Sequence, residues 1–408
     1  MNVEQLRKEF PLLSKPDAPI YLDSACMSLK PRSVIDAVVK YYEETPFCAG
    51  RGVYEGSLAV KTLVEDARRS LAEHLGARSS GTVFTKNATE AINLVAHSFP
   101  WKKGDVVLTT DREHNSNLVP WQRLRERGVR HEVVASRPDG TMDLEAWRDR
   151  LARRDVRFVA AVHVSNLDGY VAPVAELVRL AHEAGDVRVL LDGAQAASHL
   201  SVDLARLGAD HYAVSAHKML GPTGVGALLS KPEALDELSP FITGGNTVAR
   251  TTYDGAPEFL DGPAKFEAGL QNYAGIAGVK PAVELLARLG MGKVHSHGEE
   301  LMRRAAAAIE DVPGVDLVGA PLTTRTAIVP LSLDGIDPHA LAILLEDKHH
   351  MLVRSGDHCL HSWFNARGVP GTLRASFHAY NTRREADEFG EAVSSLTRAL
   401  QRPDGSRT

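Results

Sequence analysis

The chain has 408 residues, more than one typical hydrophobic core accommodates, which predicts a large domain accompanied by a smaller one. Its hydrophobic content of 44% and charged content of 24% are those of an ordinary soluble globular protein. The 47 Lys and Arg residues against 52 Asp and Glu residues give a net charge of -5. The sequence has no strongly basic stretch that could bind along a phosphodiester backbone, so no nucleic-acid partner is expected.

Residues 1–8 contain no apolar stretch of the signal-peptide kind, and no later window approaches the ~18 uninterrupted apolar residues of a membrane span. We therefore expect a cytoplasmic protein with no membrane partner. The three cysteines, Cys26, Cys48 and Cys359, are too few and too scattered for a disulfide framework. The His-rich segment 295–300 is interpreted as a solvated helix face, so no metal site is predicted.

Short apolar segments alternate along the chain with segments of helical period, which predicts an α/β fold. The predicted strands are nearly all apolar, as expected for strands covered on both faces. They are residues 82–85, 105–109, 157–164, 187–191, 211–214 and 226–229. The helices predicted before and between them include residues 63–75, 89–97, 174–183 and 204–207.

After about Gly278 the pattern changes to one that suits a smaller α+β domain. A long helical stretch is followed by a strand at 327–333, a helix after Pro338, a strand through Leu352 and Val353, and a last helix at 383–400. We predict a large domain over residues 15–280 and a small domain over residues 1–14 and 281–408. The tail at 402–406 is expected to be disordered.

Lys218 is the most informative residue, because Asp192 lies upstream of it at the end of an apolar run. Pyridoxal 5′-phosphate (PLP) needs a lysine amine, an aspartate that keeps its pyridine nitrogen protonated, and phosphate-binding donors beside the lysine. Lys218, Asp192 and the polar groups of Ser215 and His217 supply these. A lone surface lysine is the alternative, and the surrounding pattern favours the cofactor.

Other polar residues follow predicted strands at the end where an α/β sheet places function. Ala88 and Thr89 lie between the strand at 82–85 and the next helix, where backbone N–H groups and a hydroxyl attract phosphate. Thr89 has an ordinary helix cap as its alternative role. His114 lies in the loop after the strand at 105–109, where an imidazole could stack on the pyridine ring and move protons.

Two amides occupy similar positions. Asn166 follows the strand at 157–164, where it could hold the phenolic oxygen of PLP, bind a substrate carboxylate, or form a turn. Gln195, three residues after Asp192, could reach the same phenolic oxygen.

A second chemical cluster surrounds Cys359, which follows a predicted strand and a glycine and is therefore expected to be exposed. The neighbouring His358, as an imidazolium, would favour a thiolate there, whereas Asp357 would oppose it. The alternative for Cys359 is a small buried hydrophobe. Arg374 could clamp a substrate carboxylate, with a surface arginine as its alternative.

Taken together, these residues resemble the class V aminotransferase superfamily of fold-type I PLP enzymes, and within it the group II cysteine desulfurases and selenocysteine lyases. The matching segments are residues 21–25, 51–52, 89–93, 113–114, 164–166, 192–195, 217–218, 221–224 and 266–269, with Arg354 and Cys359. The resemblance implies a large, mostly parallel seven-stranded sheet and a smaller α+β C-terminal domain.

The resemblance also implies a role for each candidate residue. Lys218 would carry PLP, Asp192 would face its pyridine nitrogen, and His114 would stack on its ring. The residues implied to contact the rest of the cofactor are Gln195, Ala88, Thr89, Ser215, His217 and Asn166. Those implied to bind the substrate carboxylate are Asn166, Arg354 and Arg374.

The implied reaction converts L-cysteine to alanine. Lys218 would remove the α-proton, and Cys359 would take the sulfur as a persulfide and pass it to an acceptor protein or small thiol for iron–sulfur assembly or a thio-metabolite. A homodimer is implied as well. The alternative is a PLP-dependent C–S lyase, epimerase or aminotransferase of a specialised pathway, favoured by Asp357 where the family usually has a histidine.

Overall fold

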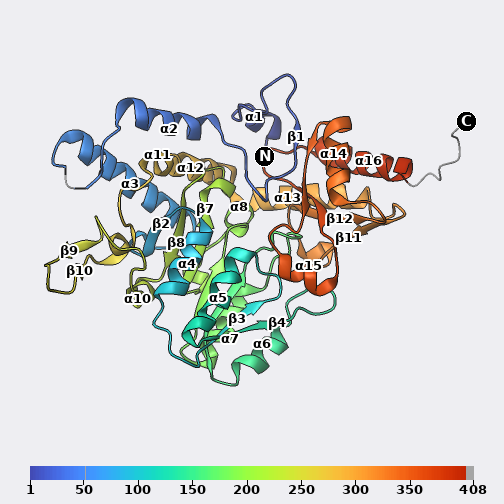
Figure 1. Ribbon diagram of the computed structural model, residues 1–408. Coiled ribbons are helices and arrows are strands. Elements are labelled where there is room, and N and C mark those ends of the chain that lie inside the picture. Colours follow the sequence, from blue (N-terminus) through green and yellow to red (C-terminus); the bar gives the residue numbers. More distant parts are fainter. Residues whose placement is uncertain (51, 401–408) are drawn as a thin grey trace, which may run out of the picture.

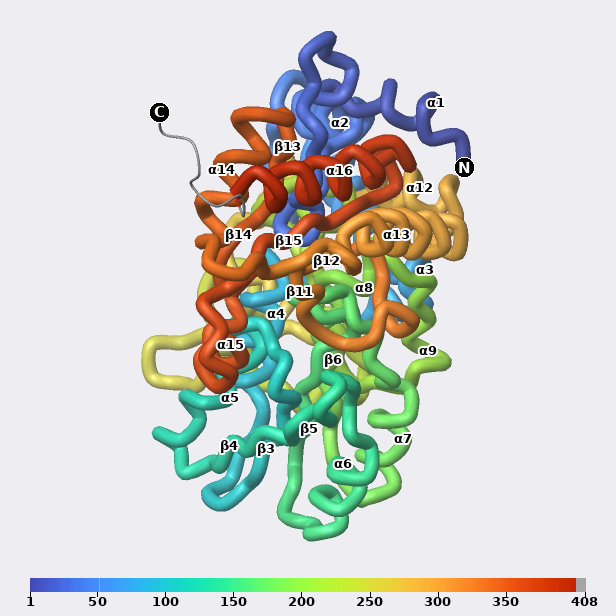
Figure 2. The backbone as a smooth tube through the Cα atoms, turned by 90° about the vertical axis from the view of Figure 1, so that its right-hand side faces the viewer, coloured from blue at the N-terminus to red at the C-terminus, as the bar shows by residue number. Residues whose placement is uncertain are grey.

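The computed structural model describes residues 1–50 and 52–400, so the tail predicted to be disordered lies outside the described residues. Two sheets organise the molecule (Figure 1). A seven-stranded sheet forms the centre of the larger part, and a four-stranded sheet forms the centre of the smaller part. The orange and red C-terminal elements gather beside the green and blue large sheet (Figures 1 and 2).

The large sheet is mostly parallel. In spatial order its strands are β2 (Thr82–Thr85), β8 (Gly226–Ser230), β7 (His211–Ser215), β6 (Arg188–Asp192), β5 (Val156–Val162), β3 (Val106–Thr110) and β4 (Arg130–Val134). Strands β7, β6, β5, β3 and β4 are parallel, whereas β8 is antiparallel to both of its neighbours. This arrangement confirms the predicted α/β class with a mostly parallel sheet.

Both faces of the central part of this sheet are buried, which explains why most of its strands are largely apolar. Within β3, Val106 and Leu108 belong to one hydrophobic cluster and Val107 to the other. The helices of this part are α2 (Arg32–Glu44), α3 (Glu55–His74), α4 (Ala88–Ser98), α5 (Val119–Arg123), α6 (Leu144–Leu151), α7 (Val174–Ala184), α8 (Ala196–His199), α9 (Leu204–Leu207), α10 (Pro232–Asp236), α11 (Tyr273–Ala277) and α12 (Val279–Leu289). Helices α3, α6, α7 and α12 contribute to the first cluster, and α4 and α5 contribute to the second.

The small sheet is antiparallel, with the spatial order β11 (Val315–Leu317), β12 (Ile328–Leu333), β15 (Thr372–Ser376) and β14 (Arg354–Gly356). Its helices are α13 (Met291–Ala307), α14 (Pro338–His349), α15 (His361–Arg367) and α16 (Arg383–Leu400). A separate core lies between α13, α14, α16 and the sheet, with Phe377 and Phe389 fully buried in it.

The N-terminal segment joins this smaller part. Strand β1 (Ile20–Tyr21) pairs in parallel with β13 (Met351–Leu352), and Arg7 of α1 (Val3–Arg7) forms an ion pair with Glu385. Helix α1 also contributes Leu6 to the core of the larger part, so the segment touches both. The division at residues 14 and 280 stays a prediction.

Most predicted elements are confirmed to within a few residues. The helix predicted at 63–75 is longer, because α3 begins at Glu55. Strand β4 was missed: four of its five residues, beginning Arg130–His131–Glu132, are half-buried or exposed, as suits a strand at the edge of a sheet. Strand β15 was missed too, although all five of its residues are buried, because Arg374 interrupts its apolar pattern.

Two absences hold for the described ranges 1–50 and 52–400. No helix there is long and apolar enough to cross a membrane. Within the same ranges, no group of three or more His, Cys, Asp or Glu side chains is arranged to hold a metal ion.

A buried ion pair fixes the segment after the β9–β10 hairpin (Val248–Arg250 and Glu258–Phe259) against the sheet edge. Arg68 donates to Glu267 at 2.5 and 3.0 Å, and Phe84 N donates to the same carboxylate at 2.7 Å. The two side chains are 6% and 11% exposed, so removing one partner leaves a charge in a poorly solvated place.

We therefore expect Glu267→Ala to lower the free energy of unfolding by about 3 kcal/mol. The matched control is Glu258→Ala, whose partner Arg250 is exposed and which should change stability little. Urea unfolding midpoints measure both. Equal shifts for the two variants would show that the buried pair has no special weight.

Candidate functional site

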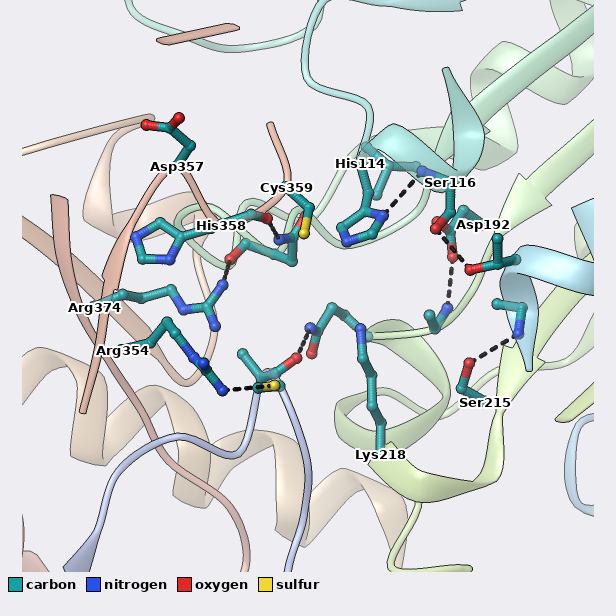
Figure 3. Close-up of a pocket in the computed structure, with 18 of the residues that line it drawn as sticks. His114, Ser116, Asp192, Ser215, Lys218, Arg354, Asp357, His358, Cys359 and Arg374 are labelled. Atoms are coloured by element: carbon teal, nitrogen blue, oxygen red, sulfur yellow. Dashed lines mark hydrogen bonds between the residues drawn. The ribbon is translucent and has the colours of Figure 1, made fainter. Parts of the chain in front are cut away.

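A cavity of about 650 Å³ lies where the two parts of the molecule meet (Figure 3). Its floor comes from the carboxyl ends of the large sheet's strands, through residues such as Val162, Asp192 and Ser215. Its opposite wall comes from the smaller part, through the segment 354–359 and Arg374. The sequence-predicted residues Ala88, Thr89, His114, Asn166, Gln195, His217, Lys218 and Cys359 all line this cavity.

Lys218 ends the short 3-10 helix η4 (Ala216–Lys218) directly after β7. Its side chain extends into the cavity in Figure 3. Burial lowers the pKa of its amine, and the carboxylate of Asp192 opposes part of that effect. A buried amine of lowered pKa spends more of its time neutral, which is the form that bonds a carbonyl carbon or removes a proton.

Asp192 is the last residue of β6 and is buried. Ala194 N donates to its Oδ1 at 3.0 Å; burial raises the pKa of the carboxyl, and Lys218 opposes this. The next residue is a glycine for a steric reason, since a Cβ at Gly193 would overlap the Tyr212 ring. The backbone therefore approaches β7 closely at this point.

A polar corner forms around the start of α4. Asn87 caps this helix by accepting from Glu90 N, Ala88 N donates to Ser215 Oγ at 2.9 Å, and the hydroxyls of Thr89 and Ser116 lie 2.7 Å apart. Helix N-termini attract anions through their N–H groups and dipole. The corner thus has the donors that a phosphate requires.

His114 lies in the loop after β3 with a defined tautomer. Its Nδ1 accepts from Ser116 N at 3.0 Å, so the ring proton of the neutral form is on Nε2 (Figure 3). Burial, with Lys218 and Arg374 nearby, lowers the pKa of His114 to about 3. The ring is therefore a neutral N–H donor near pH 7.

Several buried polar atoms of the cavity have no hydrogen-bond partner among the described residues. Among them are Asn166 Oδ1, Gln195 Oε1 and Arg374 Nε. Each side chain is fixed by its other end: Asn166 Nδ2 donates to His358 O at 2.8 Å, Gln195 Nε2 to Ala25 O at 2.6 Å, and Arg374 Nη1 to Asn166 O at 2.6 Å. Buried polar groups of this kind are satisfied when a polar ligand binds.

A carboxylate that the sequence analysis did not assign organises the two arginines. Asp23 accepts from Arg354 Nη2 at 2.7 Å and lies 3.6 Å from Arg374 Nη2. One anion therefore faces two guanidinium groups, which leaves a net positive charge for a substrate anion. The position of Asp23 just after β1, at the end of a strand, was the available signal.

Cys359 is exposed, as predicted, in a strained backbone. His358 and Cys359 both have left-handed φ values, 47° and 60°, which residues other than glycine adopt rarely. Asn115 N donates to Cys359 O at 2.8 Å, and His361 Nδ1 lies 2.8 Å from Asn115 Nδ2, so contacts on both sides hold the loop.

The predicted imidazolium beside Cys359 is wrong. Burial lowers the pKa of His358 to about 2, and its Nε2 lies 2.8 Å from Thr372 Oγ1. The ring is therefore neutral and serves to fix the loop. The cation that shares the cavity with the thiol is instead the guanidinium of Arg374.

The residues present fit PLP. A lysine with a lowered pKa and a buried aspartate lie at the ends of neighbouring strands, a helix N-terminus with hydroxyl groups suits the phosphate, and unpartnered amide oxygens face the cavity. Other polar residues line this cavity without having been assigned from the sequence, among them Cys26, Ser116, His339 and His361.

Comparison with known proteins agrees with this geometry. Residues 20–389 match the family model described as Aminotransferase class-V. A protein of Halobacterium salinarum named as a probable cysteine desulfurase is 39% identical over 402 residues, covering 96% of each chain. The cysteine desulfurase of Escherichia coli strain K12 is 35% identical, covering 98% of this chain and 99% of its own.

Solved structures are similar over the same extent. The apo cysteine desulfurase of Thermococcus onnurineus has a TM-score of 0.92 at 34% identity and covers 97% of this chain and 98% of its own. The cysteine desulfurase CsdA of Escherichia coli, in an S-sulfonic acid form, has a TM-score of 0.90 at 31% identity and covers 98% and 99%.

Three histidines whose pKa values are lowered by burial, two in the cavity and His199 of α8, predict how stability depends on pH. Burial lowers the pKa of His114 to about 3 and those of His199 and His217 to about 4, from about 6.5 in the unfolded chain. Below pH 6.5 the unfolded state binds protons that the folded state does not, so stability present above that pH is lost as the pH falls. At pH 5 each of these histidines lowers the free energy of unfolding by up to about 2 kcal/mol.

We expect the thermal midpoint to fall between pH 7 and pH 5, and His114→Asn to make that fall smaller. The control is His350→Asn, because His350 is exposed and has a left-handed φ of 53° that asparagine tolerates. Calorimetry across this pH range measures the slopes. A midpoint that rises as the pH falls would contradict the assignment.

Proposed function

This chain belongs to the class-V aminotransferase family, and from that premise we propose that the protein is a PLP-dependent cysteine desulfurase. It converts L-cysteine to L-alanine and keeps the sulfur on Cys359 as a persulfide. The observation that carries the proposal is an exposed thiol, Cys359, and an amine of lowered pKa, Lys218, in one cavity. The names of the full-length relatives support it.

PLP would be held along the floor of the cavity. Lys218 would bond it, Asp192 would keep its pyridine nitrogen protonated, and His114 would lie against its ring. The residues proposed to hold its phosphate and phenolic oxygen are Ala88, Thr89, Ser215, His217, Gln195 and Asn166. When bound, PLP supplies an electron sink for negative charge that develops on the substrate.

The substrate carboxylate would lie between Arg374 and Arg354, with Asn166 beside it. The unpartnered Nε of Arg374 supports this, because a carboxylate would satisfy it. Asp23 neutralises only one of the two guanidinium charges, so the pair still attracts an anion. Asp23 also fixes where the guanidinium of Arg354 lies.

Two groups would move protons. The neutral amine of Lys218 is suited to remove the proton from the substrate Cα. His114 presents Nε2–H, so it is suited to donate a proton or a hydrogen bond to the departing part of the substrate.

Sulfur transfer would then take place at Cys359. Its thiolate attacks the substrate sulfur, an S–S bond forms on the enzyme, the substrate C–S bond breaks, and the three-carbon product leaves as alanine. The exposed position of Cys359 also lets an acceptor protein or small thiol collect the sulfur. We propose that this sulfur supplies iron–sulfur or thio-metabolite assembly and that the protein is cytoplasmic. The division into a large domain over residues 15–280 and a small domain formed by the rest of the chain is part of the same proposal.

We also propose that the protein forms a homodimer. Large hydrophobic side chains are exposed on two segments that project on the same side of the molecule in Figure 1, α2–α3 and the region around β9 and β10. Tyr42 is 64% exposed, Leu58 is 52% exposed and Leu270 is 72% exposed. A second copy of the chain would cover this apolar surface.

Leu270→Asp is therefore expected to shift the protein from dimer to monomer, because a carboxylate would be buried in an apolar contact. The control is Ile343→Asp on α14, since Ile343 is 58% exposed outside this surface. Light scattering over a range of concentrations measures the mass. A monomeric wild type, or equal behaviour of both variants, would contradict the interface.

The reaction is tested by incubating the purified holoenzyme with L-cysteine and a reductant and measuring alanine and sulfide. Wild type should form both, and Cys359→Ser should lose both by at least about a hundredfold, since the covalent sulfur carrier is gone. Lys218→Ala should lose both as well. Cys48→Ser is the control, because Cys48 is exposed outside the cavity.

The same assay separates the alternative function. If Cys359→Ser still releases sulfur from L-cysteine at the wild-type rate, the protein is a C–S lyase that does not need the thiol. If wild type gives neither product, its substrate is not cysteine.

A further inference from the structure

The cavity contains a second thiol that the proposed reaction does not use. Cys26 lines it together with Cys359 and Lys218. Its backbone is held firmly, since Ala25 N donates to Ser376 Oγ at 2.9 Å, Ala25 O accepts from Gln195 Nε2 at 2.6 Å, and Cys26 N donates to Asp23 O at 3.1 Å. The thiol therefore has a fixed place on the cavity wall.

A guanidinium contacts this sulfur directly. Arg354 Nη2 donates to Cys26 Sγ at 2.9 Å, a contact drawn as a dashed line in Figure 3. A guanidinium donor bonds more strongly to an anionic sulfur than to a neutral thiol. Both sulfurs share the cavity with the amine of Lys218 and the guanidinium of Arg374.

An independent feature marks this part of the cavity as a place for a ligand. Arg374 is 3% exposed, lines the cavity, and has an Nε without a hydrogen-bond partner in residues 1–50 and 52–400. Cys26 is half-buried, whereas Cys359 is exposed. A sulfur atom bound to Cys26 would be less accessible to outside thiols than one bound to Cys359.

We propose that Cys26 is a second sulfur carrier, which takes the terminal sulfur from the Cys359 persulfide within the cavity. This inference rests on the proposed desulfurase function. It gives the two thiols different tasks: Cys359 takes sulfur from the substrate, and Cys26 stores it. Cys26 is then a catalytic residue, because its sulfur forms a bond in the transfer.

The transfer balances without an added oxidant or reductant. The Cys26 thiolate attacks the terminal sulfur of the Cys359 persulfide, an S–S bond forms on Cys26, and the S–S bond on Cys359 breaks. Cys359 leaves as a thiolate, and the terminal proton travels with the transferred sulfur. One persulfide is consumed and one is formed, so Cys359 is free to accept a second sulfur.

The test treats the holoenzyme with a small excess of L-cysteine without reductant, quenches with an alkylating agent, and locates persulfides by peptide mass spectrometry. Trypsin separates the three cysteines, because Cys26, Cys48 and Cys359 fall in peptides 9–32, 41–51 and 355–367. We expect persulfide adducts on Cys359 and Cys26. The alanine burst per protomer should fall about twofold in Cys26→Ser, since one of two acceptor thiols is lost.

Cys26→Ser keeps a hydrogen-bond acceptor for Arg354, whereas Cys26→Ala removes it. If Cys26 only held Arg354 in place, the two variants would differ in activity. Persulfide would then be found only on Cys359, in wild type and in both variants. Cys48→Ser should match wild type.

Alanine formation with persulfide on Cys359 but never on Cys26 overturns the second carrier and leaves the proposed function standing. A Cys26 adduct that persists in Cys359→Ser overturns the transfer, because Cys26 then takes sulfur directly. A wild type that forms no alanine overturns the proposed function itself.

Discussion

The burial of the Lys218 amine beside the Asp192 carboxylate is the interaction on which the site depends. Both residues stand at the carboxyl ends of β7 and β6, which are neighbouring parallel strands, so the sheet fixes their separation. Taking an amine and a carboxylate out of water is costly, and only a well-packed core can hold them there. The two hydrophobic clusters on the faces of the sheet supply that core, and the result is an amine whose pKa burial lowers.

In the opposite wall of the cavity, Asp23 is the residue that holds the two arginines together. It belongs to the N-terminal segment that adds to the smaller part through β1 and an isolated parallel bridge between Asp23 and Ser376. From there its carboxylate faces Arg354 and Arg374, which come from two adjacent strands of the small sheet. A segment from the start of the chain and strands from its end thus form one anion-binding wall. The same segment brings Cys26 into the cavity.

Local patterns carried much of the fold and of the cofactor end of the site. The strands of the large sheet are recognisable because burial on both faces makes them apolar, and the polar residues that follow them reach one edge because parallel strands end together. Edge strand β4 was not predicted, because it is only partly buried and its sequence is therefore not apolar throughout. The neutral state of His358 was not predicted either. It results from burial, and burial depends on packing between distant segments, which the sequence around His358 does not show.

The sequence by itself determined the α/β class, the candidate lysine and aspartate, and the exposed cysteine, because strand periodicity and motif order are local properties of the chain. Only the tertiary structure decided that Asp23 and Cys26 share a cavity with Lys218 and Cys359, and that the rings of His114 and His358 are neutral. Contacts across more than 300 residues of chain, such as that between Cys26 and Arg354, depend on how the smaller part packs against the large sheet. Periodicity specifies elements, whereas the dielectric environment and the distances between side chains arise only when those elements are assembled.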